Sequence, residues 1–142
     1  MKIGYSCSPL TINARTDKRI VSKNFSNEDF IETLRENLIN LKLILNHNIE
    51  HDIHLFRISS DILDNSILYT GSTDWTSILK DEIKEIADLI KNNDIRVTMF
   101  PQKYTLLNSP NLEVVKKSIA FIEEHVRFMK SLNLDTSHKI IL

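Results

Sequence analysis

Glycine and cysteine are scarce in this sequence, and each shortage excludes a class of function. The 142 residues include only two glycines, so there is no glycine-rich loop of the kind that holds nucleotide phosphates. The one cysteine, Cys7, has no partner for an internal disulfide, which fits a reducing compartment. The sequence also has no apolar run of membrane-spanning length and no signal-peptide stretch at its amino terminus. We therefore expect a cytoplasmic, soluble protein without a membrane partner.

Neither sign of charge is in excess. The chain has 18 basic and 19 acidic residues, and its net charge of -1 gives no global electrostatic case for nucleic-acid binding. A local basic groove is still compatible with this balance. Apolar residues make up 42% of the chain and charged residues 26%, as in ordinary globular proteins. The length predicts one domain, residues 1–142, with a substantial core.

Short apolar segments alternate with amphipathic ones along the chain. Strands are expected to begin near residues 2, 53, 95 and 138. Helices are expected from Ser26 to 46–48, over 74–91 and over 110–133, with Ser26 capping the first and Ser109–Pro110 opening the third. This β-α-β-α-β-α-β order predicts parallel strands with right-handed crossovers. By itself it fits either an open α/β sheet or about half of a TIM barrel.

Each predicted helix has apolar residues at spacings of three and four, which indicates one buried face. The rows are Ile31, Leu34, Leu38, Leu41 and Leu45; Leu79, Ile83, Ile86 and Ile90; and Val115, Ile119, Ile122, Val126 and Met129. Trp75, at the start of the second helix, is expected to pack in the core rather than to stack on a base. We interpret His54 as a packed histidine and His125 as structural or exposed.

Residues 95–100 alternate strictly, as a strand does. One face carries Ile95, Val97 and Met99, and the other carries Arg96, Thr98 and Phe100. Pro101 ends this strand, and a long polar loop leads to the third helix. In parallel α/β folds, loops at the carboxyl ends of strands carry ligands and chemistry. We therefore expect the functional site at this loop.

Three other polar segments precede or follow predicted strands. Residues 11–23 are rich in basic side chains and form either a solvated loop or a phosphate-contacting loop at the mouth of a barrel. Residues 57–61 form either a turn that starts a helix or part of a site. Residues 64–72, which include Gly71, are expected to be a polar loop.

Four segments together resemble the UV damage endonuclease family. They are residues 3–7, 56–61, 96–111 and 138–142, and they occur in the family's order and spacing. The resemblance covers essentially the whole chain but only the amino-terminal half of the family's fold. It implies a partial TIM barrel, a half-barrel of parallel strands. The family nicks DNA on the 5′ side of UV photolesions.

The resemblance also implies a site for UV-damaged double-stranded DNA. Tyr5 and Tyr104 match aromatic positions that probe the lesion. Lys103 stands where many members have glutamine, and Pro9 stands where asparagine is usual. The further positions implied to bind DNA are Arg57, Ser59, Ser60, Gln102 and Asn108.

A cluster of divalent, manganese-type metal ions is implied by the family, but this sequence departs from it. Phe100 stands at a metal-binding histidine position, and a phenyl ring has no lone pair for a cation. The next family histidine would follow Leu142, where the sequence stops. His47, His51 and His54 span a helix-to-strand junction, so we expect no common metal-binding face from them. We expect no complete catalytic set and no activity from this chain alone.

Two functions stay open at this point. The first is a truncated or degenerate UV damage endonuclease homologue that serves DNA repair. The second is a non-catalytic half-barrel that binds a partner: a carboxyl-terminal half-barrel, a second copy of itself, or DNA. A fragment of a sugar-isomerase-like barrel is a weaker alternative, because the Tyr104 loop and residues 57–61 argue against it.

Overall fold

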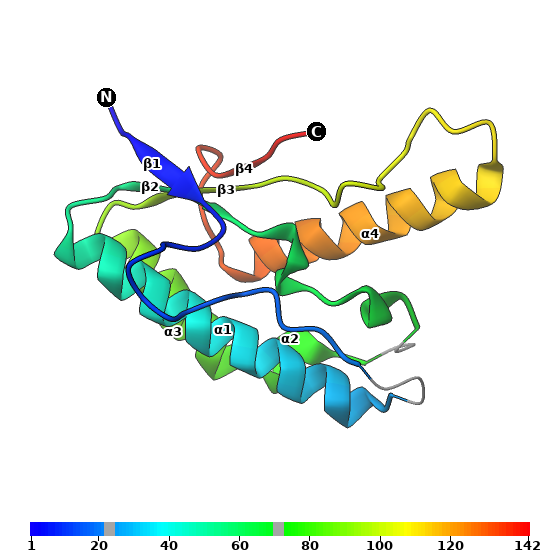
Figure 1. The fold of residues 1–142 in the computed structure, drawn as a ribbon, viewed down its shortest axis with the longest axis horizontal. Coiled ribbons are helices and arrows are strands. Elements are labelled where there is room, and N and C mark those ends of the chain that lie inside the picture. The colour runs from blue at the N-terminus through cyan, green and yellow to red at the C-terminus, as the bar shows by residue number, and fades with distance from the viewer. Residues whose placement is uncertain (22–24, 70–72) are drawn as a thin grey trace.

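The chain forms a four-stranded parallel sheet with its helices packed against one face (Figure 1). The computed structural model describes residues 1–21, 25–69 and 73–142. The strands lie side by side in chain order: β1 (Gly4–Ser6), β2 (Leu55–Ile58), β3 (Arg96–Met99) and β4 (Lys139–Ile140). Sequential parallel strands with helices on a single face are the arrangement of a TIM barrel rather than of an open sheet covered on both faces. The predicted α/β half-barrel is therefore confirmed.

Three long helices cover the sheet. They are α1 (Asn27–Glu50), α3 (Lys80–Asn92) and α4 (Leu112–Ser131). The core lies between them and the sheet, and its largest fully buried side chains include Trp75, Phe30, Phe56 and Phe128. The predicted packing of Trp75 is confirmed, and its indole nitrogen donates a hydrogen bond to Glu124 at 3.1 Å. No helix within the described residues is long and apolar enough to cross a membrane.

The predicted start of α1 is confirmed. The Ser26 hydroxyl accepts a hydrogen bond from the Asp29 amide at 3.1 Å, and the Asp29 carboxylate accepts one from the Ser26 amide at 2.7 Å. This reciprocal pair satisfies backbone donors that the first helical turn leaves free. The predicted apolar row is buried at Leu34, Leu38, Leu41 and Leu45, whereas Ile31 is only partly buried.

The single helix predicted over residues 74–91 is wrong in one respect, because it divides into α2 (Trp75–Ile78) and α3. The break falls at Leu79, whose side chain is fully buried. Next to α2, the Asp74 carboxylate accepts hydrogen bonds from the Thr76 and Ser77 hydroxyls, and such short side-chain bonds compete with regular helix. The α3 row is buried as predicted.

The loop predicted over residues 64–72 also contains structure. A 3-10 helix spans Asn65–Tyr69, and Ile67 within it is buried; another, Ser60–Ile62, immediately precedes this segment and buries Ile62. These apolar side chains order a segment whose polar composition indicated a loop. Gly71 and Lys23, which were assigned to loops, lie outside the described residues.

The start of α4 differs from its prediction. Asn111, not Ser109, caps the helix, because the Asn111 side chain accepts a hydrogen bond from the Glu113 amide at 2.9 Å. The Ser109 hydroxyl instead accepts one from the Asn111 amide at 3.2 Å. Pro110 therefore precedes the cap and is not in the first turn. Asn and Ser are comparable as caps, so the sequence offered two equivalent starts.

The buried face of α4 was also predicted wrongly. The side chains that enter the core are Ser118, Phe121, His125 and Phe128. In the predicted row, Ile119 is 45% exposed, and the other members are only partly buried. The two phenylalanines pack between α4 and the sheet. His125 can be buried there because both of its ring nitrogens lie within hydrogen-bonding distance of backbone carbonyls. The helix is thus apolar on two faces, of which one is buried in the core and the other is covered only in part.

Candidate nucleic-acid interface

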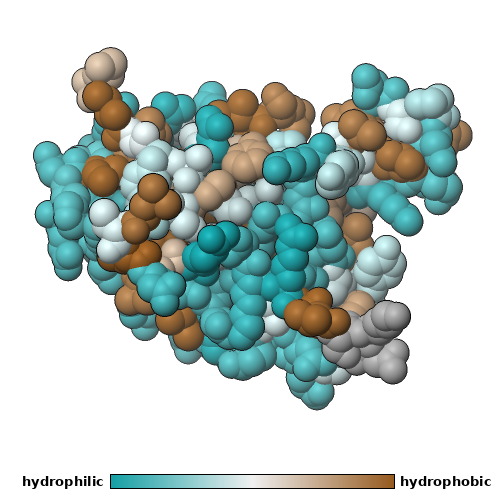
Figure 2. Space-filling view, viewed as in Figure 1, coloured by the Kyte–Doolittle hydropathy of each residue, from teal (hydrophilic) through white to brown (hydrophobic). Residues whose placement is uncertain are grey.

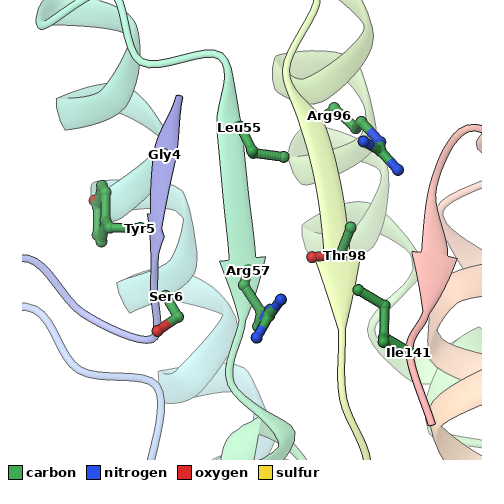
Figure 3. Close-up of a pocket in the computed structure, with 8 residues that line it drawn as sticks. All are labelled: Gly4, Tyr5, Ser6, Leu55, Arg57, Arg96, Thr98 and Ile141. Carbon is green, nitrogen blue, oxygen red and sulfur yellow. The ribbon is translucent and has the colours of Figure 1, made fainter. Parts of the chain in front are cut away.

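The face of the sheet without helices holds a cavity of about 330 Å³ (Figure 3). Side chains alternate along each strand, so one set faces the helices and the other faces this cavity. The cavity is lined from neighbouring strands by Ser6, Leu55, Arg57, Arg96, Thr98 and Ile141. Two of these are cations and none is acidic. The cavity is therefore a local basic surface on a chain with almost no net charge.

Arg57 is the cation at the carboxyl end of β2. Its guanidinium carbon lies 5.8 Å from the centre of the Phe100 ring, within cation–π range. Its side chain has no protein hydrogen-bond or ion-pair partner among the described residues, so its donors face solvent. Arg57 and Thr98 are register partners, and Figure 3 shows both side chains directed into the space between β2 and β3.

The residues that the structure describes do not fit a metal cluster. Phe100 has no ligand atom, and among the described residues no group of three or more His, Cys, Asp or Glu side chains could hold an ion. His47 and His51 stack on each other with ring centres 4.1 Å apart. The ring of His54 is bound elsewhere, to the Asn93 carbonyl at 2.9 Å and the Asp52 carboxylate at 2.8 Å. These two hydrogen bonds raise the pKa of His54, and the bond to Asp52 has the larger effect.

Tyr5 lies apart from the other predicted DNA-binding residues. Its side chain points away from the cavity, as Figure 3 shows, and its hydroxyl donates a hydrogen bond to Asn48 in α1 at 2.5 Å. Its ring packs edge-on against Phe56, with centres 5.2 Å apart. Burial raises the pKa of this phenol. The geometry gives Tyr5 a packing role in this chain, and its contact with a lesion stays a prediction.

Ser59 and Ser60 form a turn after β2, one of the two interpretations left open for this segment. The Ser59 hydroxyl accepts a hydrogen bond from the Asp61 amide at 3.2 Å, which starts the following 3-10 turn. Ser60 is buried, and its carbonyl lies 3.1 Å from the Nε2 atom of His125. Contacts of the two serines with DNA stay predictions.

Asp61 joins three segments that follow different strands. Its Oδ1 atom accepts a hydrogen bond from Arg19 at 3.0 Å and one from Gln102 at 3.1 Å. Arg19 belongs to the segment after β1, and Gln102 belongs to the loop after β3. Sequence reasoning placed Asp61 near the site but did not identify it as the link, because the partners are 42 and 41 residues away.

The loop after β3 projects beyond the sheet (Figure 1). Within this loop Tyr104 is 85% exposed, and Lys103 and Asn108 are also exposed. Figure 2 shows apolar side chains on this projection. Leu107 of the loop and Leu112, the first residue of α4, are both exposed. The loop is attached to α4 by a hydrogen bond from the Leu106 amide to the Ser118 hydroxyl at 2.9 Å. It thus presents an aromatic ring beside a lysine, a pairing suited to a base and its phosphate.

The basic segment over residues 11–23 is mostly paired with carboxylates. Arg15 contacts Asp17, Lys18 contacts Glu36, and Arg19 contacts Asp61. These ion pairs favour a structural role over phosphate contact for the described part of this segment. Arg57 and Arg96, which line the cavity, are in contrast not paired with any carboxylate among the described residues.

Sequential parallel strands, one open face and polar loops at the carboxyl ends define a half-barrel of the TIM type. A family model described as UV-endonuclease UvdE matches residues 3–142, and the chain belongs to this family. It is 46% identical over all of its length to a UV DNA damage endonuclease of Clostridium perfringens, of which it covers 34%. A UV DNA damage endonuclease of Bacillus pumilus is 29% identical over 81% of the chain, which covers 36% of that protein.

The solved structure of SacUVDE confirms the fold. The two structures agree with a TM-score of 0.88 and 33% sequence identity over 99% of this chain, which corresponds to 48% of that one. The chain therefore spans about a third of the length of the curated relatives named above and about half of the solved structure. The resemblance seen in the sequence is thereby confirmed.

Proposed function

We propose that this chain is the amino-terminal, DNA-binding half of a UV damage endonuclease, a hydrolase that nicks DNA 5′ to photolesions for repair. The observation that carries the proposal is the loop after β3. Its exposed Tyr104 and Lys103 lie beyond a basic cavity and are linked through Gln102 to Asp61. Membership in the UvdE family and the names of the relatives support the same substrate.

In this proposal each exposed group has a distinct task. The Tyr104 ring stacks on an unstacked base at the lesion, a contact that is worth about 1–3 kcal/mol per base. Lys103 contacts a backbone phosphate as a point charge. Gln102, fixed by Asp61, orients the loop and extends towards the duplex.

Hydrolysis of DNA by this family implies bound metal ions, and we propose that a partner of this chain holds them. Because the described residues do not gather a ligand set, we propose that a complementary carboxyl-terminal half-barrel holds the manganese-type cluster. The partly covered apolar row of α4 and a groove lined by Val126, Met129, Leu134 and Ile140 fit such a partner. The match to about half of SacUVDE supports this division.

A second candidate is a non-catalytic half-barrel that binds damaged DNA without cutting it. The observation that favours it is Phe100, which stands at a family histidine position and contacts Arg57 instead of a metal ion. Both candidates share the same DNA-binding surface. They differ only in whether a complementary half restores hydrolysis.

Binding to UV-irradiated duplex DNA tests the shared proposal. We expect tighter binding to irradiated than to unirradiated duplex by fluorescence anisotropy with a chelator present. We expect Tyr104→Ala to lower the affinity for irradiated duplex at least about tenfold, which corresponds to one lost stacking contact.

Tyr69→Ala is the matched control, because Tyr69 is also an exposed tyrosine, at 67%, but lies before α2. It should leave the affinity unchanged. Equal binding to both duplexes, or equal effects of the two substitutions, would contradict the proposed function.

A further inference from the structure

The cavity on the open face of the sheet has the composition of an anion site. Arg57 and Arg96 supply two positive charges, and Ser6 and Thr98 supply hydroxyl donors. Leu55 and Ile141 give the wall an apolar part, which lowers the local dielectric constant and strengthens charge interactions. None of the described residues that line the cavity is a carboxylate that could neutralise the arginines. An unbalanced pair of cations in a hollow surface attracts an anion.

The two arginines are held in different ways. The Nε atom of Arg96 donates a hydrogen bond to the Ser137 carbonyl at 2.9 Å, which anchors its side chain next to β4. The guanidinium of Arg57 lies over the Phe100 ring. A cation–π contact uses the positive charge of the guanidinium and none of its N–H donors, which stay free for an oxyanion. Phe100 thus contacts Arg57 without occupying its donors.

We propose that this cavity binds a phosphate group without a metal ion, with Arg57 as the two-pronged donor. The Thr98 hydroxyl, beside Arg57 in the strand register, contributes a further donor. Arg96, which points towards β4 in Figure 3, adds positive charge at longer range without contacting the same phosphate. Guanidinium and phosphate match in geometry, so paired N–H donors bind paired oxygens. The proposal rests on the proposed function only for the source of the phosphate, which we take to be the DNA backbone.

Inorganic phosphate is the probe that tests the site directly. The full chain, labelled with nitrogen-15, is titrated with phosphate in the presence of a chelator, and the arginine Nε–H resonances are followed by NMR. We expect saturable shifts at Arg57. We expect Arg57→Gln to weaken phosphate binding about tenfold or more, since it removes a charge-assisted pair of hydrogen bonds.

Two further variants make the result specific. Arg57→Lys keeps the charge but loses the paired donors, and its affinity should fall between those of the original chain and Arg57→Gln. Lys117→Gln removes one charge from an exposed position on α4 and should leave phosphate binding unchanged. Circular dichroism checks that every variant is folded. An unmoved Arg57 resonance, or equal effects of Arg57→Gln and Lys117→Gln, would overturn the proposal.

Competition with unirradiated duplex DNA identifies the source of the phosphate. Displacement of bound phosphate by duplex supports a DNA phosphodiester as the natural ligand. Phosphate binding without displacement overturns the DNA source and leaves a site for free phosphate. Because the Tyr104 experiment uses lesion preference as its readout, the failure of one proposal is distinguishable from the failure of the other.

Discussion

Gly4 lies where the backbones of β1 and β2 approach each other. A Cβ atom at this position would lie 1.6 Å from the carbonyl oxygen of Leu55, far inside van der Waals contact. The neighbour is backbone, and it cannot rotate away as a side chain tip can. One of the two glycines in the sequence is therefore required by the pairing of the first two strands.

We predict that Gly4→Ala destabilises the chain by about 1–3 kcal/mol or more, the range for overpacking in a rigid environment. Urea unfolding followed by circular dichroism measures this change. Ser6→Ala is the control, because Ser6 is exposed on the same strand and face. Equal unfolding midpoints for the two variants would show that β1 is not held against β2 in solution.

At the scale of a single element, β4 depends on an unusual contact. The strand has only two residues, and the Val97 amide of β3 donates a hydrogen bond to the Nδ1 atom of His138 at 3.1 Å. An imidazole nitrogen that accepts a hydrogen bond must be unprotonated. Burial lowers the pKa of His138 below its ordinary value of 6.5, although Asp135 at 3.9 Å opposes the shift.

We predict that the docking of β4 weakens as the pH falls. A lowered folded-state pKa means that the neutral ring stabilises the fold above about 6.5, and this stabilisation is lost as the pH falls through the folded-state value. Hydrogen-exchange protection of the Val97 amide, compared between about pH 8 and about pH 5, measures the loss. In His138→Gln, whose side-chain carbonyl accepts but does not titrate, the protection should not vary. The same pH dependence in both chains would contradict this account.

The helices show which features a sequence predicts at this scale. The start of α1 was predictable because Ser26 and Asp29 are three residues apart and bind each other. The buried face of α4 was not, because two apolar rows lie on one helix and periodicity cannot rank them. His125 concealed the correct row, since a histidine rarely marks a core position.

In the candidate site, too, local patterns were predictable from the sequence and contacts between distant segments were not. Strand alternation correctly placed Arg96 and Thr98 on the face opposite Val97 and Met99. It could not show that Tyr5 faces α1, because that depends on how β1 pairs with β2. Contacts between distant segments, such as Asp61 with Gln102, leave no local pattern and required the structure.

At the scale of the whole molecule, the outer apolar row of α4 is covered only in part. The row contains Ile119, at 45% exposure, and its members Val126 and Met129 line the groove that also includes Leu134 and Ile140. Covering a few hundred Å² of apolar surface is worth several kcal/mol at about 25 cal/mol per Å². In isolation, a second copy of the chain can cover it through a two-fold interface.

We predict that the isolated chain self-associates at micromolar concentration and that Ile119→Lys raises the dissociation constant at least about tenfold. Sedimentation velocity over a concentration series measures both. Ile39→Lys is the matched control, because Ile39 is an exposed isoleucine on α1, at 51%. A chain that stays monomeric, or equal effects of both lysines, would show that this row is not the contact.

The carboxylate of Asp61 has a consequence for the whole surface that surrounds the cavity. Its Oδ1 atom accepts hydrogen bonds from both Arg19 and Gln102. These bonds connect the segments that follow β1, β2 and β3. Loops that are already joined lose less conformational entropy when a large ligand spans them. The ordering of this surface therefore takes place when the protein folds, before any large ligand binds.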